Sequence, residues 1–198
     1  MAAAIAHPHL KSANINASHG NDLDNVNVSN SNETNISNTN DYQYSEGINF
    51  KLDLPKHLTT VDDFTQKKGV TGAHTSYSFN RAVKEYNLRI TSKVEHPTVK
   101  GVYEIRYEIP LKNKQLEYTG DYKEIKEPKT VYDPSIIPDD KIMEWGQQAA
   151  DQGLDRAIAN NDRRIEVTVN DLTFRVYVDL NTKTVINFFP IILKENVI

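Results

Sequence analysis

The sequence predicts an α+β fold, with helices first and then a mostly antiparallel β-sheet into which one helix is inserted. In residues 75–86, apolar side chains recur at spacings of three and four, which is typical of a helix that covers a core. In residues 101–109, one set of side chains (Tyr103, Ile105, Tyr107 and Ile109) alternates strictly with a second set (Val102, Glu104, Arg106 and Glu108), and this period of two predicts a strand. Residues 165–169 and 172–179 predict two strands joined at Asn170-Asp171, whose residue types favour a tight turn.

The other expected elements complete this order along the chain. They are helices over residues 61–64 and 138–152, a turn region over 113–120, and strands over 122–125, 129–132 and 184–189. We expect Pro110 to end the strand that begins near residue 101, because proline cannot donate to a ladder of hydrogen bonds. We expect Gly153 to end the long helix, since glycine often terminates helices.

Composition divides the chain into two parts. Residues 1–50 contain 11 asparagines, one basic and five acidic residues, and no aromatic residue before Tyr42. Such a segment buries too little apolar surface to offset the entropy lost on ordering, so we expect this asparagine-rich segment to be disordered. Residues 51–198 have the composition of a globular protein, and we expect them to form one folded domain.

Charge and cysteine content exclude several classes of protein. Residues 51–198 contain 22 basic and 22 acidic residues, so they lack the basic excess of a protein that coats duplex DNA. A small, local phosphate-binding site is still compatible with this balance. The chain has no cysteine, which excludes disulfides and cysteine-based zinc sites. No apolar run has the length of a membrane span and the first residues do not resemble a signal peptide, so we expect no membrane partner.

Two histidines and a lysine are the candidate catalytic residues. His74 lies just before a predicted helix, His57 lies 17 residues upstream, and Lys129 begins a predicted strand. This set is sufficient for RNA cleavage by the RNA's own 2′-hydroxyl. One neutral histidine removes the 2′ proton, one protonated histidine gives a proton to the leaving 5′ oxygen, and the lysine stabilises the charge on the phosphorane. We therefore expect no metal ion and no cofactor.

Some alternatives remain open at this point. His96, in Glu95-His96-Pro97, competes with His57 for the role of second histidine, although a turn-capping role also suits it. The acidic pairs Asp62-Asp63 and Asp139-Asp140 leave room for a metal-dependent nuclease, but acidic residues are also ordinary caps at helix starts.

Several short motifs, in this order along the chain, resemble those of the bacterial toxin branch of the EndoU ribonucleases. The motifs are Gly72-Ala73-His74, Lys129-Thr130-Val131-Tyr132, Ile137-Pro138-Asp139-Asp140-Lys141-Ile142 and Val185-Ile186-Asn187-Phe188-Phe189-Pro190. The resemblance covers residues from about 55 to 192. His57 lies near the position of the family's first catalytic histidine. Asn187 stands where the family usually has threonine or serine, and it retains a hydrogen-bond donor.

The resemblance implies a two-lobed EndoU or barnase-like nuclease fold and a function for this chain. It implies a metal-independent endoribonuclease toxin that leaves 2′,3′-cyclic phosphate and 5′-hydroxyl ends, with tRNA as the expected RNA substrate. His57, His74, Lys129 and Asn187 are the expected catalytic residues. Gly72, Thr130 and Tyr132 are the expected RNA contacts.

The resemblance also implies a biological setting. It implies a monomer that is secreted or delivered from the cell surface as part of a contact-dependent growth inhibition toxin. Such a toxin acts in the cytoplasm of the target cell and is blocked by a cognate immunity protein. The alternative is a catalytically inactive binding or immunity-type module of the same toxin system.

Overall fold

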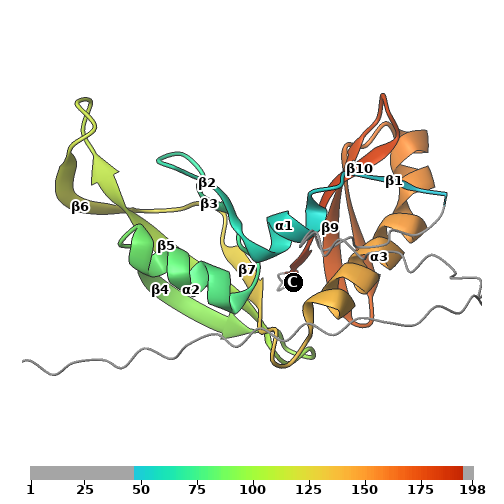
Figure 1. Ribbon diagram of the computed structural model, residues 1–198, viewed down its shortest axis with the longest axis horizontal. Helices are drawn as coiled ribbons and strands as arrows, with labels where there is room; N and C mark the ends of the chain where they lie inside the picture. The colour runs from blue at the N-terminus through green and yellow to red at the C-terminus, as the bar shows by residue number, and fades with distance from the viewer. Residues whose placement is uncertain (1–46, 194–198) are drawn as a thin grey trace, which may run out of the picture. The chain divides into compact units, whose positions relative to one another are not determined.

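The computed structural model describes residues 47–193 (Figure 1). The chain divides into two units, Met1–Asn40 and Asp41–Ile198, and the described residues belong to the second. The disorder expected for residues 1–50 therefore falls almost wholly outside the described residues. Its last two residues, Asn49 and Phe50, form a short strand, so pairing starts slightly before the expected boundary.

The observed elements make an α+β fold, as the sequence predicts. The helices are α1 (Leu54–Thr59), α2 (Ser76–Glu85) and α3 (Asp139–Asn160). The strands are β1 (Asn49–Phe50), β2 (Val61–Thr65), β3 (Gly69–Gly72), β4 (Arg89–Glu95), β5 (Val102–Lys112), β6 (Tyr118–Glu124), β7 (Lys129–Tyr132), β8 (Arg164–Val169), β9 (Leu172–Asp179) and β10 (Thr184–Ile191). Among the described residues, no helix combines the length and apolar character that crossing a membrane requires.

One sheet has the strand order β1-β10-β9-β8 and is covered by α3 (Figure 1). Its apolar face and α3 enclose the larger hydrophobic cluster, which includes Phe174 and Phe188. Two buried glycines let α3 approach this sheet closely. A Cβ atom on Gly146 would overlap the ring of Phe188, and one on Gly153 would overlap Ile165.

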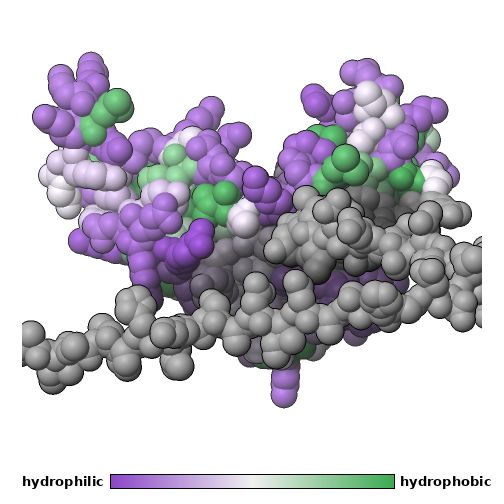
Figure 2. Space-filling model, viewed as in Figure 1, coloured by the Kyte–Doolittle hydropathy of each residue, from purple (hydrophilic) through white to green (hydrophobic). Residues whose placement is uncertain are grey.

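The second sheet has the order β4-β5-β6, and β7 also pairs with β5. It packs with α2 and β3 around a second cluster that contains Phe79 and Tyr107. Strand β7 contributes to both clusters, because Val131 packs in the second and Tyr132 in the first. The two clusters agree with the two lobes that the family resemblance implies. Hydrophilic side chains predominate on the face drawn in Figure 2, where hydrophobic ones form small separate patches.

Four expectations about elements are wrong. Residues 61–64 form strand β2 instead of a helix, because they pair with β3 in a hairpin. Helix α3 continues through Gly153 to Asn160, since that glycine is needed for packing against the sheet. Strand β5 continues through Pro110, which lies beside an irregularity in the pairing with β6 where its missing N–H is tolerated. Strand β6 begins at Tyr118, inside the expected turn region.

Candidate active site

A strained backbone turn places His74 at the start of α2. Gly72 and Ala73 both have positive φ values, +69° and +53°, in the region that most residues avoid. A side chain at Gly72 would collide with the backbone at Thr60 and Asp62. The backbone N–H of His74 donates to the carbonyl of Leu58 at 2.6 Å. The turn is therefore held against the α1–β2 connection, and His74 is fixed immediately before the helix.

The His74 ring has a defined tautomer. Its Nδ1 lies 2.9 Å from the carbonyl oxygen of Thr130, so Nδ1 carries the proton and donates. The Nε2 atom then presents a lone pair, and Lys129 Nζ lies 3.3 Å from it. Burial lowers the pKa of His74 well below 6.5, and the charges of Lys129 and His57 lower it further. His74 is therefore a neutral imidazole at neutral pH.

Lys129 is almost completely buried beside His74, with only 7% of its surface exposed. Its ammonium donates to the carbonyl oxygen of Gly72. Burial lowers the pKa of Lys129 from 10.5 to about 7, and this lowering is partly opposed by Asp62. A buried cation without a carboxylate in contact is costly. Such a residue is suited to bind an incoming anion such as a phosphate.

His57 lies in α1 and is anchored by its neighbours Leu54 and Leu58, which are each 1% exposed. Its Nδ1 is hydrogen-bonded to the carboxylate of Asp62. Asp62 is the extra residue of a β-bulge, because Val61 pairs with Gly72 while Asp63 pairs with Thr71. Such bulges redirect side chains. Burial lowers the pKa of His57, and the hydrogen bond and charge of Asp62 oppose that lowering.

A second bulge delivers residues of β10 to the same place. The pairing of β10 with β9 shifts between Val185 and Asn187, so Ile186 is the extra residue. After this shift, Val185 and Phe188 both face the core, while Asn187 and Phe189 both line the opposite cleft. Asn187 Nδ2 lies 2.9 Å from His57 Nε2.

The two histidine rings lie side by side, with 5.3 Å between their centroids. The ring of Phe189 stacks on the ring of His74, with 4.5 Å between the ring centroids and an interplanar angle of 16°. Tyr177 continues this row, with its ring centroid 6.0 Å from that of Phe189. The catalytic candidates thus adjoin an aromatic surface of the kind on which nucleic-acid bases stack.

One cleft of about 1020 Å³ lies between the two lobes of the described unit, and it is lined by His57, His74, Lys129, Tyr177, Asn187 and Phe189. One wall comes from β3, β5 and the β6–β7 connection, and the other comes from β9 and β10. The volume is at the upper end of the range, roughly 300–1,000 Å³, that holds a drug-sized ligand. The cleft can therefore take more than one nucleotide.

Comparison with known proteins identifies the family to which this chain belongs. A family model described as bacterial EndoU nuclease matches residues 53–192. This chain belongs to the bacterial EndoU nuclease family. A protein named tRNA nuclease CdiA from Yersinia mollaretii is 45% identical over 145 residues, which cover 73% of this chain. A protein of the same name from Escherichia coli strain STEC_O31 is 42% identical over 152 residues, or 75% of this chain. The chain spans only 5% of the length of each of these relatives.

The structure brings together four of the residues expected in an EndoU site: His57, His74, Lys129 and Asn187 all line the cleft. His96, the alternative second histidine, is elsewhere. Its Nδ1 accepts from the backbone N–H groups of Thr98 and Val99, so it caps a turn, and it does not line the cleft.

Two of the three expected RNA contacts of this EndoU chain line the cleft, and the third does not. Gly72 and Thr130 line the cleft, and their carbonyl oxygens accept from Lys129 and His74. Tyr132 is fully buried, and its hydroxyl donates to Asp139 at 2.8 Å. Its side chain holds the start of α3 and does not line the cleft.

The acidic pairs are also separated by the fold. Asp62 contacts His57, and Asp139 accepts from Tyr132. Within residues 47–193, no group of three or more histidine, aspartate or glutamate side chains is placed to hold a metal ion.

Sequence reasoning does not identify Asp62, Phe189 or Tyr177 as parts of the site. The sequence leaves Asp62 as either a metal ligand or a helix cap, and its position five residues after His57 is the signal that indicates a contact between the two. In the sequence, Phe189 is distinguished only as part of the terminal motif Val185-Ile186-Asn187-Phe188-Phe189-Pro190. Its position two residues after Asn187 in a strand predicts that both side chains share a face, which is the arrangement found here.

Proposed function

We propose that this EndoU domain is an endoribonuclease that cleaves RNA by attack of the 2′-hydroxyl on the adjacent phosphate. One observation carries the proposal. Two histidine rings with different hydrogen-bond partners lie 5.3 Å apart in a cleft, with a buried lysine beside them. The two rings supply an acid and a base, and the lysine supplies a positive charge for the phosphate.

His74 is the general base. Its Nδ1–H is held by Thr130, so its Nε2 lone pair takes the 2′ proton as the 2′ oxygen bonds to phosphorus. The pKa of His74, lowered well below 6.5 by burial, keeps the ring neutral at neutral pH. In the free protein the Lys129 ammonium lies against this nitrogen. A bound phosphate would attract the ammonium and leave Nε2 to the hydroxyl.

His57 is the general acid. When the bond between phosphorus and the 5′ oxygen breaks, His57 donates a proton to that oxygen, which leaves as a hydroxyl. Asp62 favours this role because its carboxylate stabilises the imidazolium form. An anionic phosphate in the cleft acts in the same direction and raises the pKa of His57.

Lys129 stabilises the additional negative charge that the phosphate oxygens acquire in the transition state. A charge inside a water-poor site interacts more strongly than a charge in bulk water. Together the three side chains complete the reaction without a metal ion. The products are a 2′,3′-cyclic phosphate and a 5′-hydroxyl, so DNA is not a substrate.

The relatives named tRNA nuclease support tRNA as the substrate. Because this chain corresponds to a small part of those long proteins, we propose that it is the toxic domain of a larger toxin used in contact-dependent growth inhibition. The toxin is delivered from the cell surface and acts in the cytoplasm of a competing bacterium. A cognate immunity protein protects the producing cell.

Incubation of the purified protein with total bacterial tRNA in EDTA tests the activity. Wild-type protein should give discrete fragments. His74→Ala should cleave roughly 10²- to 10⁴-fold more slowly, which is the usual contribution of a general base. His96→Ala is the matched control, because that histidine caps a turn outside the cleft, and it should cleave like wild type. Absence of cleavage by wild type, or equal loss in both variants, contradicts the proposal.

A further inference from the structure

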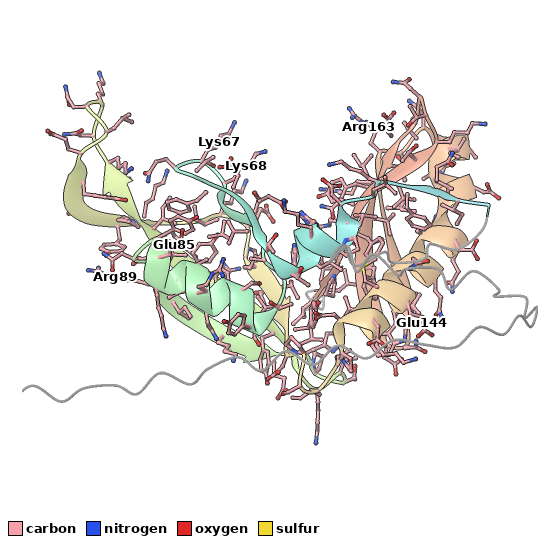
Figure 3. All side chains as sticks on the ribbon, viewed as in Figure 1. Lys67, Lys68, Glu85, Arg89, Glu144 and Arg163 are labelled. Carbon is pink, nitrogen blue, oxygen red and sulfur yellow. The ribbon has the colours of Figure 1, made fainter. Side chains whose placement is uncertain are left out.

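Three lysines line one part of the cleft beyond the proposed catalytic residues. Lys67 and Lys68 form the turn between β2 and β3, and Lys126 lies in the connection between β6 and β7. In Figure 3, Lys67 and Lys68 project from the tip of the β2–β3 hairpin. All three line the same continuous cleft as His57 and Lys129.

These lysines differ from the arginines of the cleft in their partners. Arg106 Nη1 lies 3.2 Å from Glu124 Oε1, and Arg175 Nη2 lies 2.7 Å from Glu166 Oε1. Both arginines therefore form ion pairs with carboxylates. The three lysines are exposed, and no ion pair involves them among residues 47–193. Glu127 is the neighbouring acidic residue in this part of the cleft. The lysines therefore leave a local positive excess in a domain that is neutral overall.

The segments that carry the lysines are held firmly. The hydroxyl of Tyr107 accepts from the backbone N–H of Val70 at 3.0 Å, directly after the turn. Gly69 has a φ of +69°, and a Cβ atom there would lie 2.9 Å from the side chain of Ile125. Gln66 Nε2 donates to the carbonyl of Pro110 at 2.9 Å. The hairpin turn and the β6–β7 connection are thus packed together where Gly69 contacts Ile125. Lys68 and Lys126 are the sequence neighbours of these two residues, so both lysines lie beside this contact.

We propose that Lys67, Lys68 and Lys126 bind successive backbone phosphates of a single-stranded stretch of the RNA substrate, beyond the phosphate that is cleaved. This inference rests on the proposed function and names the surface that holds the rest of the strand. Proteins that bind single strands combine lysines that follow the backbone with aromatic rings on which bases stack. Here Phe189 and Tyr177 supply the rings and the three lysines supply the charges. Contacts of this kind position the strand without reading its sequence.

The experiment measures binding separately from cleavage. In a His74→Ala background, the affinity for tRNA is measured at several salt concentrations by fluorescence anisotropy. Each phosphate contact contributes about −0.7 to the slope of log affinity against log salt for a single strand. The triple variant Lys67→Ala, Lys68→Ala, Lys126→Ala should therefore bind more weakly, with a slope smaller in magnitude by about 2.

Two further variants make the result specific. Lys84→Ala, Lys100→Ala, Lys114→Ala removes the same charge from exposed lysines that do not line the cleft, and its slope should match the background. Replacing Lys67, Lys68 and Lys126 by arginine keeps the charges and should retain the slope. Equal slopes in the two alanine triple variants overturn the inference, as does binding that salt does not weaken. Cleavage by the wild-type protein reports on the proposed function independently of these slopes.

Discussion

The side-chain nitrogen of Asn187 lies 2.9 Å from His57 Nε2. The other ring nitrogen of His57 is hydrogen-bonded to Asp62, so both nitrogens already have protein partners. An amide nitrogen donates, so Nε2 accepts, and this arrangement favours the neutral ring. Within the described part of the chain, Asn187 Oδ1 is buried and has no hydrogen-bond partner. His57 must therefore exchange Asn187 for the substrate before it acts on RNA.

Removal of this amide should raise the pKa of His57. In Asn187→Ala, the donor that favours the neutral ring is lost and water gains access to Nε2, and both changes favour the protonated form. Titration of ring resonances by NMR, in protein labelled at histidine, measures the shift. His96 serves as an internal control. A lowered His57 pKa would instead show that the amide presents its oxygen to the ring.

The dependence of kcat/KM on pH should be bell-shaped with an optimum below pH 7. Activity rises as His74 loses its proton, and the pKa of His74 lies well below 6.5 because the ring is buried. Activity falls as the acid His57 and Lys129 lose theirs, and the pKa of Lys129 is about 7. Rates on one RNA at constant ionic strength check this. A flat profile, or an optimum above pH 8, contradicts the assigned roles.

Asp62→Asn should slow cleavage by less than the roughly 10²- to 10⁴-fold loss expected for His57→Ala. Asparagine keeps the shape of the side chain but removes the charge that opposes the lowering of the His57 pKa. The falling limb of the pH profile should therefore move to lower pH. Asp63→Asn, at the adjacent position in β2, is the matched control. A uniform loss without movement of the limb would indicate a structural role for Asp62.

Lys129→Met should abolish cleavage and raise the free energy of unfolding at neutral pH by about 1–3 kcal/mol. The folded-state pKa of Lys129, about 7, lies below the value of 10.5 for the exposed amine. The unfolded chain binds the extra proton between these values, so wild-type stability rises with pH there. The amount by which the free energy of unfolding of Lys129→Met exceeds that of wild type is therefore largest below pH 7, and it disappears towards pH 10.5. Urea unfolding at several pH values measures it, and a pH-independent difference contradicts the argument.

Gly146→Ala should destabilise the protein although alanine is the better helix former by about 1 kcal/mol. The added methyl group would overlap the buried ring of Phe188, and overpacking of a core typically costs about 1–3 kcal/mol. Thermal or urea unfolding measures the effect. Gln152→Ala, at an exposed position of the same helix, should change stability little. An increase in stability for Gly146→Ala would show that α3 lies farther from the sheet.

Strands with a local signal were predictable from the sequence. The β8–β9 hairpin and β7 have the expected positions because alternation and turn residues are local signals. The sequence also indicates His57, His74 and Lys129 as candidates, since the proposed chemistry restricts the residue types, and the structure brings these three side chains to one cleft. In contrast, the continuation of α3 through Gly153 depends on contact with Ile165, which comes from a later strand.

The contacts that two other side chains make with His57 depend on features that the sequence does not reveal. Asp62 and Asn187 reach His57 through bulges in β2 and β10, which shift the register by one residue. A bulge depends on the pairing partner, so alternation within one strand does not reveal it. The role of Tyr132 was equally hidden, because its burial depends on the docking of α3 through Asp139.

Cleavage of an RNA oligonucleotide, with and without a single 2′-deoxy substitution at the cleaved position, tests the central claim most directly. The reaction is run in EDTA, and the product ends are identified by mass spectrometry. The proposed chemistry predicts 2′,3′-cyclic phosphate ends from the unmodified RNA and no cleavage at the substituted position. Continued cleavage at that position, or products with a 5′-phosphate, would contradict attack by the 2′-hydroxyl and with it the roles of His57, His74 and Lys129.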